Sequence, residues 1–141
     1  AAKIGAFMKT IVTDCYTQAE QDVFNNGMAG LDRACEKLNG KSFMNCSPEQ
    51  RKNFLITLEK EAKDFNDKKN EAEKTNREVA KKEGKEFTGA PPHYYSMIKQ
   101  LTLFGYFTSE IGQTKALRLL PVPGKYDGAH PYNKGDKAWA I

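Results

Sequence analysis

The sequence lacks the long apolar runs and the one-sided charge that characterise several classes of protein. No stretch approaches the ~18 consecutive apolar residues that a membrane-spanning helix needs, so we predict no membrane span. The 22 basic and 18 acidic residues leave a net charge of only +4, and they are interspersed along the chain. Nucleic-acid-binding domains carry a clustered basic stripe, so nucleic acid is not an expected partner. The 141 residues are enough to bury a core, and we expect one helical domain over residues 1–141.

Motifs for catalysis and for cofactor or metal binding are also missing. "GKSF" and "PVPGKYDG" contain Gly-Lys, but neither has the G-x-x-x-x-G-K-[ST] frame that cradles phosphate. Gly105 and Gly112 do not form the G-x-G-x-x-G fingerprint of a dinucleotide site. His93 and His130 each lie beside a proline, without a nucleophile, base and orienting group in a recognisable pattern, and surface or helix-capping roles are the simpler reading. We therefore predict no catalytic, cofactor-binding or metal-binding residue, and no enzyme activity in this chain on its own.

Cysteine is scarce, and its spacing excludes the common cysteine motifs. The chain has three cysteines, Cys15, Cys35 and Cys46, and neither C-x-x-C nor C-x-x-C-H occurs. Two states stay open from the spacing. Either all three are reduced, buried thiols, or Cys35 and Cys46 form a disulfide between the end of one helix and the start of the next.

What the sequence does contain is apolar residues spaced three and four apart, which predict an all-α fold of four to five helices. The first helix is expected over residues 4–15. The second begins at the capping-box pattern "TQAE", residues 17–20, and ends at Asn39-Gly40, because Gly tolerates the left-handed conformation of a C-cap. No alternating pattern long enough for a β-strand occurs anywhere in the chain.

The third helix has the strongest start signal, "SPEQ" at residues 47–50, which combines a Ser N-cap, a Pro in the first turn and a Gln that completes the capping box. Its core face is expected to hold Phe54, Leu55, Leu58, Ala62 and Phe65. Residues 59–86 then hold nine acidic and nine basic residues. This charged extension is expected to be either a solvated helix supported by Glu/Lys pairs or a mobile excursion, and we favour a helix that frays into a loop.

The last part of the chain is unusually apolar and aromatic. A fourth helix is expected to begin after Pro91-Pro92, and Ser109 is expected to cap a short following helix. At 100° per residue, the side chains of "LTLFGYF", residues 101–107, surround the helix axis and leave no wide polar face. Residues 119–141, rich in Pro, Gly and aromatic residues, are expected to form a long irregular C-terminal arm.

This apolar content predicts either a surface that another protein covers or an arm that wraps over the chain's own core, and the two are compatible. Large, conformationally restricted aromatic side chains are the residues that anchor protein interfaces. The interface residues that we predict are Tyr95, Phe104, Tyr106, Phe107, Pro121, Pro123, Tyr126 and Trp139.

Two segments resemble a known family. "LTLFGYFTSEIGQTKALRLLPVPGKYDG", residues 101–128, with "KGDKAW" at 134–139, resembles the C-terminal half of the gluconate 2-dehydrogenase subunit 3 family. "GKSFMNCSPEQRKNFLITLEKEA", residues 40–62, is similar to that family's middle segment. The resemblance covers most of residues 15–139 and is weakest through the charged stretch.

The resemblance implies a non-catalytic small subunit that binds and stabilises a larger partner, in a heterodimer or a higher assembly. That partner is a flavoprotein of the glucose-methanol-choline (GMC) type, which carries FAD and oxidises a hydroxyl of a sugar, sugar acid or glycoside. The resemblance leaves open whether a cytochrome c subunit joins them. It also implies a periplasmic location, reached by twin-arginine export, although this chain shows no signal sequence. That oxidising compartment favours a disulfide between Cys35 and Cys46. The alternative is a free-standing secreted helical module that binds a small ligand such as a sugar.

Overall fold

The computed structural model describes residues 1–122, 124 and 128–140, and these form an all-α fold, as predicted. The described residues form four α-helices and two shorter helical turns, and β-structure among them is limited to one isolated bridge. The chain divides into two compact units, of which one comprises residues 1–10 and 100–141 and the other residues 11–99. The single domain expected over residues 1–141 stays a prediction.

Helices α1 (Ile4–Cys15) and α2 (Gln18–Asn39) begin and end where the sequence signals predict. The Thr17 hydroxyl accepts a hydrogen bond from the Glu20 N–H, while the Glu20 carboxylate accepts one from the Thr17 N–H at 2.8 Å. Helix α2 stops at Gly40, whose φ of 70° is left-handed and whose N–H donates to the Glu36 carbonyl. This reciprocal cap and this glycine satisfy backbone groups that the helix itself leaves unpaired.

Helix α3 (Pro48–Lys82) is the longest element, and its first half carries the core of residues 11–99. It follows a short 3₁₀ turn, η1 (Phe43–Asn45), and its Ser47–Gln50 capping box is present as predicted. Phe54, Leu58 and Ala62 are buried, as expected for the core face. Phe65, expected on the same face, is 48% exposed, because the buried face of α3 ends near Ala62.

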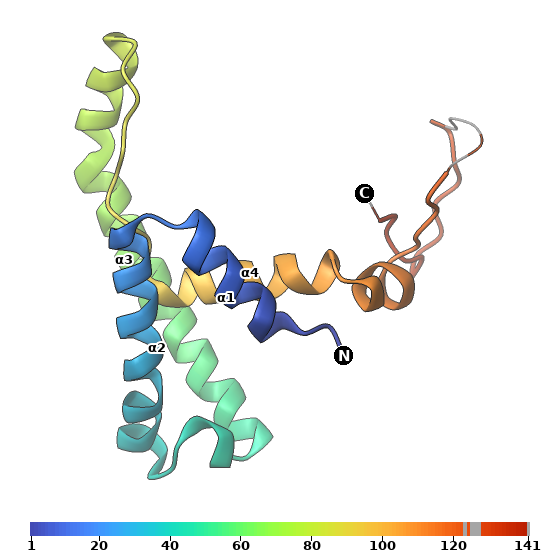
Figure 1. The fold of residues 1–141 in the computed structure, drawn as a ribbon, viewed down its shortest axis with the longest axis horizontal. Helices are drawn as coiled ribbons and strands as arrows, with labels where there is room; N and C mark the ends of the chain where they lie inside the picture. Colours follow the sequence, from blue (N-terminus) through green and yellow to red (C-terminus); the bar gives the residue numbers. More distant parts are fainter. Residues whose placement is uncertain (123, 125–127, 141) are drawn as a thin grey trace. The chain divides into compact units, whose positions relative to one another are not determined.

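The charged extension continues as helix to Lys82, and the chain then turns back along it (Figure 1). Asn66 fixes the end of the returning segment, because its side chain accepts from the His93 N–H at 3.0 Å and donates to the Ser96 hydroxyl at 2.9 Å. Farther out, the Glu73 carboxylate accepts from the Ala90 N–H at 2.7 Å, and Lys69 donates to the Ala90 carbonyl at 3.2 Å. The segment expected to fray therefore has specific partners on α3.

Helix α4 (Tyr94–Phe107) follows, and then a π-helical turn, η2 (Gly112–Ala116), leads into the C-terminal arm. Arg118, directly before the arm, forms a parallel β-bridge with Trp139 of the arm. Arg118 donates its N–H to the Ala138 carbonyl at 2.8 Å and accepts at its own carbonyl from the Ala140 N–H at 2.9 Å. The described part of the arm is thus irregular, and backbone hydrogen bonds hold its end, residues 138–140, against Arg118.

Candidate functional site: the exposed apolar surface of α4 and the arm

Helix α4 has two apolar faces, which explains the absence of a polar face in its sequence. Met97, Leu101 and Gly105, four residues apart, are buried. Leu103 and Phe107 lie about 200° and 240° around the helix from Leu101, on its other side, and are 48% and 41% exposed. Phe104 lies about 60° from Leu101, at the edge of the buried face, and is 55% exposed. We call these three residues, with Ile111 just beyond the helix, the α4 surface.

Close contacts hold the residues around the α4 surface in place. A Cβ on Gly105 would lie 2.6 Å from a Phe7 ring carbon of α1, and the Phe7 ring meets the Phe104 ring edge-on at 5.5 Å. Ser109 caps the next turn as predicted, because its hydroxyl accepts from the Gly112 N–H at 3.1 Å and donates to the Tyr106 carbonyl at 2.6 Å. The aromatic side chains of this surface are therefore presented from a backbone with defined contacts.

The arm adds further exposed apolar side chains in the same compact unit. Leu119, Leu120 and Val122 are all exposed, and Trp139 is 46% exposed. One face of the Trp139 indole is covered by the arm itself, since the Arg118 guanidinium carbon lies 4.3 Å from the indole centre and the His130 ring contacts it edge-on at 5.6 Å. The Arg118 Nε atom is buried without a hydrogen-bond partner in the described residues.

The structure brings together some of the predicted interface residues and separates others. Phe104 and Phe107 are exposed on α4, and Tyr106 is half-buried with its ring edge-on to Phe107 at 5.2 Å. Pro121 and Trp139 are exposed in the arm, while Pro123 and Tyr126 lie outside the described residues. Tyr95 belongs to the other compact unit, where it is half-buried against the core.

Cys35 and Cys46 face each other in the core of residues 11–99. Their Sγ atoms are 3.6 Å apart, both side chains are buried, and they pack with Phe54 and Leu58. They are free thiols in the structure, as is the exposed Cys15, so the disulfide stays a prediction. Burial and the hydrogen bond with Cys35 raise the pKa of the Cys46 thiol.

His93 acts as the N-cap of α4, which is one of the roles expected for it. Its Nδ1 accepts from the Tyr95 N–H at 3.2 Å, and its ring packs against Phe65 and Tyr94. Burial lowers the pKa of His93, while Glu61, 3.9 Å from Nε2, acts in the opposite direction. The described residues contain no group of three or more His, Cys, Asp and Glu side chains placed to hold a metal ion.

No helix among the described residues is both long enough and apolar enough to cross a membrane.

The sequence alone did not reveal the role of Asn66 or of Glu73, since both bond to residues at least 17 positions away. Nothing in the local pattern of the charged stretch distinguishes them from its other polar residues. The sequence also did not reveal the groove beside Tyr95.

The fold and the exposed surface define a small all-α protein whose last helix and arm present apolar side chains to solvent. The chain belongs to the gluconate 2-dehydrogenase subunit 3 family, because the model of that family matches residues 1–124 of the 141. This match confirms the resemblance of residues 40–62 and of the matched part of 101–128, and the family description is that of a subunit of a dehydrogenase complex. No curated protein and no solved structure matches the chain.

Proposed function

We propose that this chain is the small, non-catalytic subunit of an FAD-dependent dehydrogenase, and that it binds and stabilises a large GMC-type flavoprotein. FAD and the chemistry belong to that large subunit, which oxidises a hydroxyl of a sugar, sugar acid or glycoside. The role of the present chain is to cover apolar surface on the large subunit.

The observation that carries this proposal is the α4 surface. A folded protein gains stability by burying Phe and Leu side chains, yet Leu103, Phe104 and Phe107 are each about half exposed. Contiguous exposed apolar side chains of this kind are typical of interaction sites. The membership in a family of dehydrogenase subunits supports a dehydrogenase subunit as the protein that covers them.

The arm is proposed to extend this interface. Its exposed Trp139 has one face stacked on Arg118, so the indole is held in place before any partner binds. An anchor that is already ordered loses little conformational entropy on binding. Pro121 restricts the backbone of the same arm, and the predicted interface residues Pro123 and Tyr126 belong to it as well.

The proposed location is the periplasm, reached as a folded pair with the large subunit by twin-arginine export. This follows from the family resemblance. A periplasmic location is directly testable by fractionation of the native cells, because the small subunit is expected in the periplasmic fraction together with flavin-dependent dehydrogenase activity.

The test is co-expression with a GMC-type flavoprotein from the same organism. The large subunit produced with the chain is expected to be more soluble, to retain FAD and to unfold at a higher temperature than the large subunit produced alone. The matched control is co-expression with a variant that carries Leu103→Gln and Phe107→Gln, which keeps helix-forming residues while removing the apolar contacts. If yield, FAD content and unfolding temperature are the same in all three preparations, the proposed function is wrong.

A further inference from the structure

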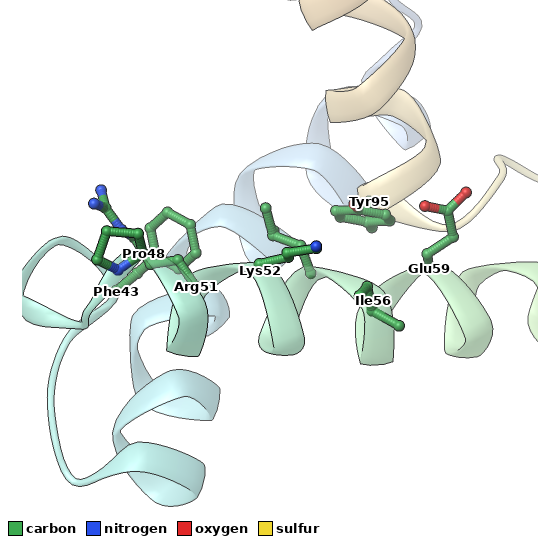
Figure 2. Close-up of a pocket in the computed structure, with 8 residues that line it drawn as sticks. Phe43, Pro48, Arg51, Lys52, Ile56, Glu59 and Tyr95 are labelled. Atoms are coloured by element: carbon green, nitrogen blue, oxygen red, sulfur yellow. The ribbon is translucent and has the colours of Figure 1, made fainter.

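A shallow apolar groove lies in the unit of residues 11–99 (Figure 2). Its volume is about 450 Å³. One wall is formed by a continuous face of the first half of α3, and Phe43 of η1 and Tyr95 of α4 close it. The α3 residues that line it are Pro48, Arg51, Lys52, Leu55, Ile56 and Glu59.

The spacing of these residues shows that they share one face of α3, on which apolar and charged side chains are mixed. They recur at intervals of three and four, which is the spacing of residues along one face of a helix. Ile56 lies about 200° around the helix from the buried Phe54, and its side chain is 45% exposed. Neither capping nor helix propensity requires a β-branched apolar residue at this exposed position.

The charges along the groove are arranged unequally. Near Glu59 the charge is neutralised, because Lys99 donates to the Glu59 carboxylate, and this bond raises the pKa of Lys99. Arg51 and Lys52, near Phe43 and Pro48, make no ion pair among the described residues. The groove therefore combines apolar side chains with two positive charges, those of Arg51 and Lys52, that have no ion-pair partner among the described residues.

We infer that this groove is a second docking site, and that it takes an apolar segment of the large flavoprotein subunit with carboxylates placed to meet Arg51 and Lys52. This inference rests on the proposed function. The charge of the groove selects an acidic segment, because cations held beside an apolar surface attract carboxylates and repel basic chains. The apolar side chains of the segment occupy the space between Phe43, Ile56 and Tyr95.

The dimensions of the groove suit a short peptide element. From Pro48 to Glu59, eleven residues along α3, the wall runs about 16 Å. That length matches about three turns of a partner helix, whose apolar residues at i, i+3 or i+4, and i+7 reach a groove of this kind. Tyr95, predicted from sequence as an interface residue, then contacts the partner here, separately from the α4 surface.

The experiment compares two charge-reversed variants in binding to the co-produced large subunit. Arg51→Glu/Lys52→Glu reverses the groove, and Arg33→Glu/Lys37→Glu changes the same residue types by the same charge on α2, outside the groove. Arg51 is the fourth residue of α3, where a glutamate is favourable for the helix, so the groove variant is expected to fold. Circular dichroism and the unfolding midpoint check this for both variants.

At 50 mM salt the groove variant is expected to bind the large subunit at least tenfold more weakly than wild type, and the α2 variant less than twofold more weakly. Raising the salt to 500 mM is expected to weaken wild type and to shrink the difference between wild type and the groove variant. If wild type binds but both variants bind equally well, the groove inference is wrong while the proposed function stands. If wild type does not bind, the proposed function fails, and the inference falls with it. If the groove variant instead loses a concentration-dependent self-association of wild type, the occupant is a second copy of this chain, and the inference is overturned.

Discussion

At the scale of single residues, polar groups that look interchangeable in the sequence differ in what they bond. His93 is one of two histidines, each beside a proline, but its Nδ1 accepts the Tyr95 N–H at the start of α4. Neutral imidazole has an acceptor nitrogen, and imidazolium has none. The cap therefore exists only while His93 is uncharged, and the pKa of His93, lowered by burial, keeps it so at neutral pH.

We expect the stability of the chain to fall as the pH drops below 6.5 because of His93. In the unfolded state His93 is protonated near pH 6.5, whereas in the folded state it is protonated only when the pH reaches its lowered pKa. Between these two pH values the unfolded state binds more protons, so a falling pH favours unfolding. His93→Asn keeps a capping acceptor without this titration. Urea unfolding at pH 7 and pH 5 should show a larger loss for wild type than for His93→Asn, with His130→Asn as the control that behaves like wild type. Equal losses in wild type and His93→Asn would exclude this role for His93.

The facing thiols of Cys35 and Cys46 predict a second measurable property. Oxidation by a small disulfide compound is expected to join their Sγ atoms, while the two thiol protons and two electrons pass to the oxidant, which leaves as two thiols. Closing a loop of this length stabilises a protein by about 3 kcal/mol. Intact mass after oxidation and alkylation without reductant should show one alkylated thiol, that of Cys15, together with a higher unfolding midpoint. Three alkylated thiols would refute the pairing.

At the scale of elements, local signals in the sequence predict the helices well, because caps and apolar spacing act over a few residues. The ends of α1 and α2 and the start of α3 coincide with the predicted signals. The signals give no information about which helices approach closely, since that depends on residues far apart in the chain. Gly27 and Gly30 lie three residues apart on α2, yet only Gly27 lies against another helix, at Tyr94 of α4.

Alanine substitutions at these two glycines are expected to have opposite effects. A Cβ on Gly27 would lie 2.1 Å from Tyr94 Cγ, whereas a Cβ on Gly30 would meet no atom within 4 Å. Gly27→Ala should lower the free energy of unfolding by about 1–3 kcal/mol through overpacking. Gly30→Ala should raise it by about 0.5–1 kcal/mol, because Ala loses less conformational entropy than Gly in a helix. Chemical denaturation measures both, and a shift in the same direction for both would contradict the packing of α2 against Tyr94.

The returning segment after α3 is expected to depend on Glu73. The hydrogen bond from the Ala90 N–H to the Glu73 carboxylate is the main cause of the lowered pKa of Glu73. The positive charges of Lys69 and Arg77 also lower it. Glu73→Ala should therefore speed amide hydrogen exchange of residues 85–90 several-fold and leave the first half of α3 unchanged. Glu71→Ala, two residues away and largely exposed, is the matched control. Unchanged exchange at residues 85–90 in Glu73→Ala would show that the segment is held by other contacts.

At the scale of the whole molecule, the sequence predicted the all-α class, the arm and the apolar circumference of residues 101–107. It did not distinguish residues that serve the chain's own core from residues left for a partner, because both are apolar. Tyr95 illustrates the difference, since it is half-buried against the core cluster of residues 11–99 and only part of its side chain is exposed. The groove beside Tyr95 is lined by residues of η1, α3 and α4. A local sequence pattern does not show that these three elements lie together.

The most direct measurement of the central claim is the mass of the purified large subunit with and without this chain, by light scattering after size exclusion. We expect wild type to elute with the flavoprotein as one complex that contains both chains. Leu103→Gln/Phe107→Gln should lose most of that complex, while Val79→Gln, at a comparably exposed apolar position on α3, should keep it. A wild-type chain that elutes alone beside an unchanged flavoprotein would contradict the account.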